Sequence, residues 1–268
     1  MHPLIDEMQS AMELAGADST EDRPKLHIDG KRVDLSASSK RLTGIAARLA
    51  SVNDKTFGPI AERLDVERLI IAEMRGGDIS ALAHCRRLTH LNITWAPKLH
   101  DISPLAQLDR LECLELTDTP KITDISALSN LKKLRVLLYR GGIWNANRAE
   151  TLEPLAGLDR LQVLVLQNLR VSSGGLRPLA VLSGLRALFL SNQFDTADYA
   201  YLAVHLPRTT CDKFAPFEVL SSEIGGCDVL VTGKRKPFLD SRKPADQVRL
   251  EKYVQAFEKL KARFSAEA

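Results

Sequence analysis

Hydrophobic residues recur in the middle of the chain in one arrangement, Leu-x-x-Leu-x-Leu or a close variant. Six copies begin at Val66, Leu88, Leu111, Leu134, Leu161 and Leu185, and successive copies lie 22, 23, 23, 27 and 24 residues apart. Alternating apolar positions at the end of each copy predict a short strand. Because one copy cannot bury its own leucines, the copies are expected to stack and to share a continuous core.

Downstream of the copies, the sequence changes to the features of a helix start. These segments are Ser80-Ala81-Leu82, Ser103-Pro104-Leu105, Ser126-Ala127-Leu128, Glu153-Pro154-Leu155 and Arg177-Pro178-Leu179. Serine suits an N-cap, and proline at the first helical position loses no hydrogen bond. We therefore expect a helical turn in each unit, capped by serine where the segment begins with serine. Cys85 takes the place of the leucine that ends this turn in other units, which favours a buried structural role.

The spacing and the leucine pattern resemble leucine-rich repeats. Within them, Asp101-Ile102-Ser103-Pro104-Leu105 resembles the internalin type, and the resemblance runs from Asp65 to Leu206. It implies an α/β fold: a right-handed leucine-rich repeat solenoid with a curved parallel sheet on the concave face, short helices or turns on the convex face, and a cap at each end. The asparagine that commonly follows the strand is absent, its places being taken by Met74, Ala96, Thr119, Gly142, Leu169 and Gln193.

We divide the chain into four parts. Residues 1–23 are expected to form a mobile or loosely docked helix, residues 24–64 an N-terminal cap, residues 65–207 the solenoid, and residues 208–268 a C-terminal cap. In the first cap, alternation around Asp29-Gly30 predicts a hairpin, and the pattern from Ser39 to Leu64 (Leu42, Ile45, Leu49) predicts a helix. In the second, a strand is expected at residues 229–232 and an amphipathic helix at residues 246–264.

Composition and motifs argue for a binding protein. The 268 residues carry a formal net charge of +3, and the longest basic run is Lys234 to Lys236, so we expect no nucleic-acid partner. No apolar run is long enough to span a membrane. Four cysteines at unrelated spacings indicate reduced thiols, and the N-terminus lacks a basic leader segment, so we expect a cytoplasmic protein. No metal-ligand spacing and no arrangement of nucleophile, base and orienting residue is present, so we expect no enzyme activity, metal or cofactor.

The solvent-facing strand positions indicate where a partner binds. They are polar in the middle units but apolar in the last three, at Val136, Leu138, Val163, Val165, Ala187 and Phe189. A contiguous apolar block of this size usually marks an interface or a covered surface. We expect a protein partner on Val136, Leu138, Val163, Val165 and Phe189, with Arg140, Trp95 and Trp144 at the rim. The alternative is that the chain's own residues 209–241 cover this block.

The narrower biological role stays open at this point. A bacterial immunity or inhibitor protein and an adaptor both fit a monomeric interaction module. The rival is a delivered effector with activity in its C-terminal region, because Cys211-Asp212 and Cys227-Asp228 resemble the catalytic cysteine of repeat-containing bacterial ubiquitin ligases.

Overall fold

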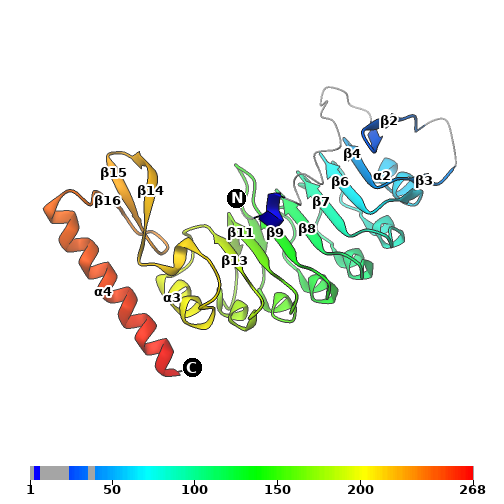
Figure 1. Ribbon diagram of the computed structural model, residues 1–268. Coiled ribbons are helices and arrows are strands. Elements are labelled where there is room, and N and C mark those ends of the chain that lie inside the picture. The colour runs from blue at the N-terminus through cyan, green and yellow to red at the C-terminus, as the bar shows by residue number, and fades with distance from the viewer. Residues whose placement is uncertain (1–2, 7–23, 36–39, 268) are drawn as a thin grey trace.

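Seven parallel strands, one for each repeat, form a curved sheet along the molecule (Figure 1). The computed structural model describes residues 3–6, 24–35 and 40–267. The sheet has the order β13-β11-β9-β8-β7-β6-β4-β1-β2. Its repeat strands are β4 (Ala46–Ala50), β6 (Arg68–Ala72), β7 (His90–Thr94), β8 (Cys113–Thr117), β9 (Val136–Arg140), β11 (Val163–Gln167) and β13 (Ala187–Leu190). Six of these are the strands predicted from the leucine pattern.

Short helices line the opposite, convex side of the solenoid (Figure 1). They are the 3₁₀ helices η1 (Ser80–His84), η2 (Ser103–Gln107), η3 (Ser126–Asn130), η4 (Glu153–Leu155) and η5 (Arg177–Val181), with α2 (Asp54–Ala61) next to η1 and α3 (Thr196–His205) next to η5. The leucines of both halves of each unit meet between the sheet and these helices in one core cluster that runs the length of the solenoid. Stacked repeats therefore bury what a single repeat exposes.

The serine caps predicted for these helices are wrong. Ser103 is the first helical residue, and the N-cap position belongs to Ile102, whose side chain cannot accept a hydrogen bond. The carboxylate of Asp101 accepts the Ser103 N–H instead, at 2.8 Å, and Asp78 and Asp124 do the same for Ser80 and Ser126. These bonds lower the pKa of Asp78 and Asp101. The Asp of the Asp-Ile-Ser motif thus starts each turn, since its side chain reaches two residues forward.

The N-terminal cap differs from its prediction in one element. The hairpin is confirmed, with β1 (Lys25–Ile28) antiparallel to β2 (Lys31–Val33) and left-handed φ values of 48° and 77° at Asp29 and Gly30. The helix predicted between Ser39 and Leu64 is wrong for its first part, which forms β3 (Leu42–Thr43, paired with β5, Leu64–Asp65) and β4. Ala47 and Leu49 of β4 alternate into the core, so this segment is a further repeat whose leucine pattern is incomplete.

A small module follows the last repeat. It contains η6 (Asp212–Phe214), the antiparallel strands β14 (Phe217–Ile224), β15 (Cys227–Val231) and β16 (Phe238–Leu239), and α4 (Pro244–Glu267). The predicted strand and helix are both confirmed, whereas β14 was not predicted. Phe257 and Phe264 of α4 are buried in the main core cluster, and α4 packs on α3. The Asn192 side chain also ties β15 to the solenoid, donating to the Val231 carbonyl and accepting from the Gly233 N–H.

Candidate functional site

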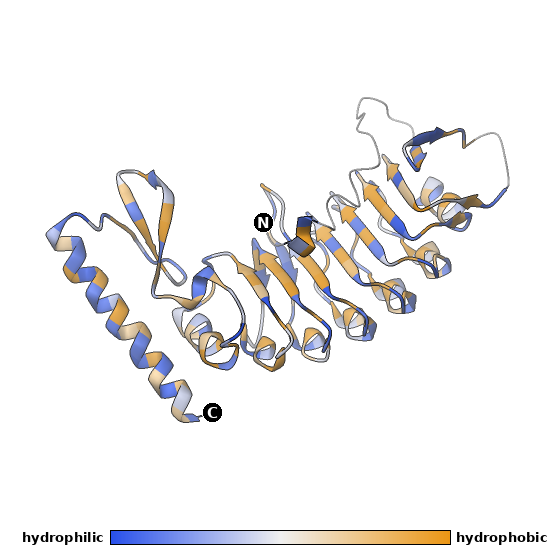
Figure 2. Cartoon of the chain, in the orientation of Figure 1, coloured by the Kyte–Doolittle hydropathy of each residue, from blue (hydrophilic) through white to orange (hydrophobic). Residues whose placement is uncertain are grey.

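The apolar block on the concave face consists of two ladders that cross the last three strands. Val136, Val163 and Ala187 pair in register across β9, β11 and β13, and Leu138, Val165 and Phe189 form the second ladder two residues further along. Side chains at these positions point away from the solenoid interior because neighbouring residues alternate between the faces of a strand. Figure 2 shows the apolar character of these strands. We call these six residues the concave cradle.

The N-terminal turn of the chain lies in this cradle. Residues 3–6 are helical, and Ile5 and Leu4 join the cradle side chains, together with Ile70 and Cys113, in one hydrophobic cluster separate from the main core. Ile5 is 4% exposed. In Figure 1 this turn, drawn in dark blue, lies over the sheet beside β9, away from the N-terminal cap that follows it in sequence. The cradle is thus buried by a segment far away along the chain.

The segment expected as the alternative cover, residues 209–241, does not take this place. Its apolar residues Cys211 and Phe214 pack against the main core instead, and Val219 and Ile224 are exposed. The segment continues past the end of the solenoid instead: Thr210 forms a parallel bridge with Ala187, and the strands that follow make a separate sheet. Of the predicted helix in residues 1–23, residues 3–6 are helical and docked, and the other residues lie outside the described part of the chain.

The concave face next to the cradle is polar and satisfies its own hydrogen bonds. Glu115 of β8 is 5% exposed; its two oxygens accept from Asn92 Nδ2 at 2.7 Å and from Thr117 Oγ1 at 2.8 Å. It also forms an ion pair with Arg140, whose Nε donates to Thr117 Oγ1. Arg140, predicted at the partner-binding rim, therefore has its charge compensated within the chain, and this network forms a fixed polar border to the cradle.

The two tryptophans predicted at the rim lie in different settings. Trp95 follows β7 directly, in a left-handed conformation with φ of 55° that recurs after other repeat strands at Ser51, Glu73, Asp118 and Asn168, and its side chain is 48% exposed. Trp144 lies on the loop between β9 and β10 (Asn147–Ala149) and is 91% exposed. It borders a cavity on the side of the solenoid together with Lys121, Arg148 and Arg170. Neither tryptophan belongs to the cradle cluster.

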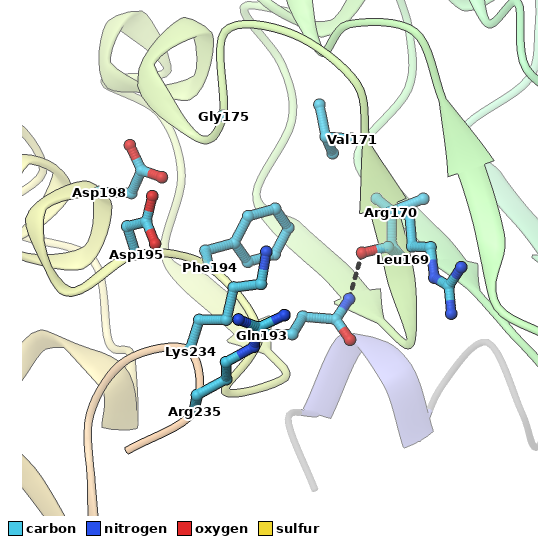
Figure 3. Close-up of a pocket in the computed structure, with 10 residues that line it drawn as sticks. All are labelled: Leu169, Arg170, Val171, Gly175, Gln193, Phe194, Asp195, Asp198, Lys234 and Arg235. Carbon is cyan, nitrogen blue, oxygen red and sulfur yellow. Dashed lines mark hydrogen bonds between the residues drawn. The ribbon is translucent and has the colours of Figure 1, made fainter.

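A second cavity, of about 570 Å³, lies where the solenoid meets the C-terminal module (Figure 3). Asp195 and Asp198 lie on one side of it in Figure 3 and Arg170 on the opposite side, with Lys234 and Arg235 below them. Burial, together with the nearby charge of Asp195, raises the pKa of Asp198. The residues that line this cavity include no serine, threonine, cysteine or histidine, so it offers no hydroxyl or thiol nucleophile and no imidazole base.

Two of the four cysteines have thiols whose pKa is raised by burial. Burial raises the pKa of Cys211 to about 12 and that of Cys85 to about 11, so both thiols are protonated at neutral pH. Within residues 3–6, 24–35 and 40–267, no three histidine, cysteine, aspartate or glutamate side chains are grouped to hold a metal ion. In the same part of the chain, no helix is both long enough and apolar enough to cross a membrane.

Comparison with known proteins finds similarity at the level of the fold. No family model and no curated protein sequence matches. Among solved structures, internalin C2 from Listeria monocytogenes shares 27% identity and a TM-score of 0.47 over 61% of this chain and 69% of its own. Internalin F from the same species shares 24% identity and a TM-score of 0.42 over 60% of this chain and 51% of its own. A leucine-rich repeat protein of Leptospira interrogans shares 12% identity and a TM-score of 0.45 over 77% and 50% of the two chains.

The fold of this chain rests on its own repeat unit. In this chain the unit is set by its own geometry: parallel strands in register, a short helix on the convex side, and leucines between them. The chain is a leucine-rich repeat solenoid.

Proposed function

We propose that this chain is a non-enzymatic protein-interaction module that binds a helical segment of a partner protein in the concave cradle. The observation that carries this proposal is the helical turn of residues 3–6, which seats Leu4 and Ile5 on the six cradle side chains. Solvent-facing strand positions need no apolar residue for the solenoid to fold. An apolar surface that the chain itself covers with a short helix is a surface suited to a helix, as in other helix-in-groove complexes.

The N-terminal turn is a competitor that a partner displaces. Fully burying one large aliphatic side chain contributes roughly 1.5 to 3 kcal/mol. The described turn buries Ile5 and partly buries Leu4. A longer partner helix that also places an apolar side chain on Phe189 covers more apolar area than the N-terminal turn does. Phe189 is only partly buried beneath the turn, which leaves apolar surface for an additional anchor. The turn thus protects the cradle from non-specific contacts and yields to a helix with more anchors.

The role of such a module is that of an adaptor or of an immunity or inhibitor protein. We infer a cytoplasmic, monomeric protein, because its thiols are all free and the inward apolar faces of its repeat strands are packed in the main core. The runner-up, an effector with C-terminal activity, requires a reactive thiolate. The raised pKa of Cys211 opposes that role at this position.

The experiment uses the full-length chain and a synthetic peptide of residues 1–23. In the unaltered protein the peptide competes with the tethered turn, whereas in Ile5→Ser the cradle is open. We expect the peptide to bind Ile5→Ser at least about tenfold more tightly, equivalent to about 1.4 kcal/mol. Calorimetry or fluorescence anisotropy measures this difference.

Matched controls separate cradle binding from non-specific adhesion. Val181→Ser removes an aliphatic side chain that is 64% exposed on the convex side, and it should leave peptide affinity unchanged. Val165→Asp places a charge in the cradle and should abolish peptide binding to the Ile5→Ser protein. Equal affinity of all variants for the peptide would refute the proposal.

A further inference from the structure

Two adjacent apolar side chains stand fully in solvent on the loop between β9 and β10. Ile143 and Trp144 are each 91% exposed, more than any other large apolar residue in the described part of the chain. Tryptophan is strongly buried on average in folded proteins. A consecutive isoleucine and tryptophan in this state therefore call for an occupant that covers them.

The loop is held in this shape by hydrogen bonds at its base. The Asn168 side-chain amide donates to the Gly142 carbonyl at 2.8 Å and to the Asn145 carbonyl at 3.2 Å. Next to it, buried Asn147 accepts the Thr119 N–H at 2.8 Å and donates to Thr119 Oγ1. Gly141 permits this close approach, because a Cβ there would lie 2.5 Å from two carbonyl oxygens. The base is fixed, so Ile143 and Trp144 are presented outward at little further cost in conformational entropy.

Positive charge gathers beside this loop without a counter-charge. The cavity that Trp144 borders, of about 530 Å³, is also lined by His100, Lys121, Arg148 and Arg170, and no carboxylate is among its lining residues. Across the residues that the structure describes, the charged groups of Lys121, Arg148 and Arg170 form no ion pair. The carboxylate of Asp118 lies against Gly142 at the base of the loop.

The two-stranded sheet of β10 and β12 places two of these positive charges side by side, which lowers its stability. β10 pairs in parallel with β12 (Leu169–Val171), and this pairing sets Arg148 directly beside Arg170. Like charges at directly paired positions destabilise a sheet. An anionic group between the two guanidinium groups removes that cost and gains charge-assisted hydrogen bonds. The pair therefore points to an anionic ligand independently of the exposed loop.

We propose that the Ile143–Trp144 loop and the Arg148–Arg170 pair form a second docking site, which takes an acidic segment of a partner protein. The segment's carboxylates bind between Arg148, Arg170 and Lys121, and an apolar residue beside them packs on Trp144. The cations line a cavity beside the loop and do not surround the tip of the loop. This arrangement suits side-chain carboxylates that enter the cavity better than it suits a flat lipid surface. This site shares no residue with the concave cradle, so the two proposals can be tested independently.

The probe is a short synthetic peptide of alternating Asp and Glu residues with a central Leu, added to the full-length chain. In a Trp95→Phe background Trp144 is the sole tryptophan, so its emission reports on the loop alone. We expect a saturable change in emission that weakens as salt rises. The pair of substitutions Arg148→Gln and Arg170→Gln should weaken binding at least about tenfold, because charge-assisted contacts are lost.

The controls distinguish binding from structural damage and from bulk charge. Lys133→Gln with Arg160→Gln removes two exposed cations elsewhere and should leave affinity unchanged. The Arg148 and Arg170 variant should keep or raise its melting temperature, since two like charges are separated. Ile143→Ser should weaken binding with no effect on stability, and this test does not use the reporter tryptophan.

Three outcomes would overturn the proposal. The first is an equal response to a neutral peptide, and the second is equal affinity of the arginine variant and its charge-matched control. The third is a response to phosphatidylserine and phosphatidylcholine vesicles with none to the acidic peptide, which would assign the loop to a membrane surface.

Discussion

Leu164 and Val165 are neighbours in β11 and are similarly buried, but their side chains lie on opposite faces of the sheet. Leu164 is 0% exposed and faces the interior, in register with Leu137 and Leu188. Val165 is 4% exposed and faces the concave side, in register with Leu138 and Phe189. The first is buried by repeats on both sides and by the convex helices. The second is buried beneath a cluster to which the N-terminal turn contributes Leu4 and Ile5.

The difference shows that burial alone does not distinguish a core from a covered binding surface. Interior burial ends only when a repeat separates from its neighbours, which costs a large part of the folding free energy. Burial of the cradle ends when one short turn leaves, and the solenoid stays intact. A covered surface of the second kind is available to a partner, whereas the interior is not.

The largest effect is expected on the interior side. Leu164→Ala should lower the free energy of unfolding by roughly 2 to 5 kcal/mol, since it opens a cavity that fixed neighbours cannot fill. Val165→Ala is its matched control and should lose only about 1 kcal/mol, because the turn above it is able to move into the space. Urea denaturation monitored by circular dichroism measures both. Equal losses would show that the two faces are one core.

The second-largest loss of stability is expected from breaking the ion pair on the polar part of the concave face. Arg140→Leu leaves the Glu115 carboxylate, 6% exposed at its side chain, without its ion-pair partner. We expect a loss of about 1 to 2 kcal/mol at neutral pH, below the value for a fully buried pair because Arg140 is 30% exposed. Arg135→Leu breaks a more exposed pair, with Glu112 at 3.6 Å, and should cost under about 0.5 kcal/mol. Adding Glu115→Gln to Arg140→Leu should restore part of the loss, and no restoration would argue against a charge effect.

The periodic parts of this molecule were predictable from the sequence, and the cover was not. Leucine spacing predicted six strands, and strand alternation predicted which side chains form the cradle. β4 was missed because Ala46, Ala47 and Ala50 weaken its leucine pattern. Leu4 and Ile5 belong to no periodic pattern, and their contact with β9 and β11 joins residues that are far apart in the sequence. The arginine pair needed the β10 and β12 register, which short rim strands do not reveal.

Removing the cover should affect stability far less than the interior substitution Leu164→Ala. Ile5→Ser should lower the free energy of unfolding by about 1.4 kcal/mol, which is the docking energy of the turn, because undocking leaves the solenoid folded. Binding of a hydrophobic dye should rise at the same time, since the cradle is then exposed to solvent. Ile45→Ser is the control, as Ile45 is already 57% exposed, and should change neither quantity. A large loss of stability in Ile5→Ser would make the turn part of the core.

The smallest effect, a change in reaction rate alone, gives the sharpest test, because Cys85 and Cys113 lie on opposite sides of the sheet. Cys85 lies in the main core, where burial raises its pKa to about 11, and Cys113 lies in the cradle cluster. Alkylation of the native protein with iodoacetamide, followed by mass spectrometry of the peptides, reports how often each site opens. In Ile5→Ser we expect Cys113 to react about tenfold faster and Cys85 at its original rate, as a tenfold change corresponds to about 1.4 kcal/mol of docking energy. Equal acceleration of both thiols would mean that the substitution loosens the whole solenoid. An unchanged rate at Cys113 would mean that the N-terminal turn is not what shields the concave face.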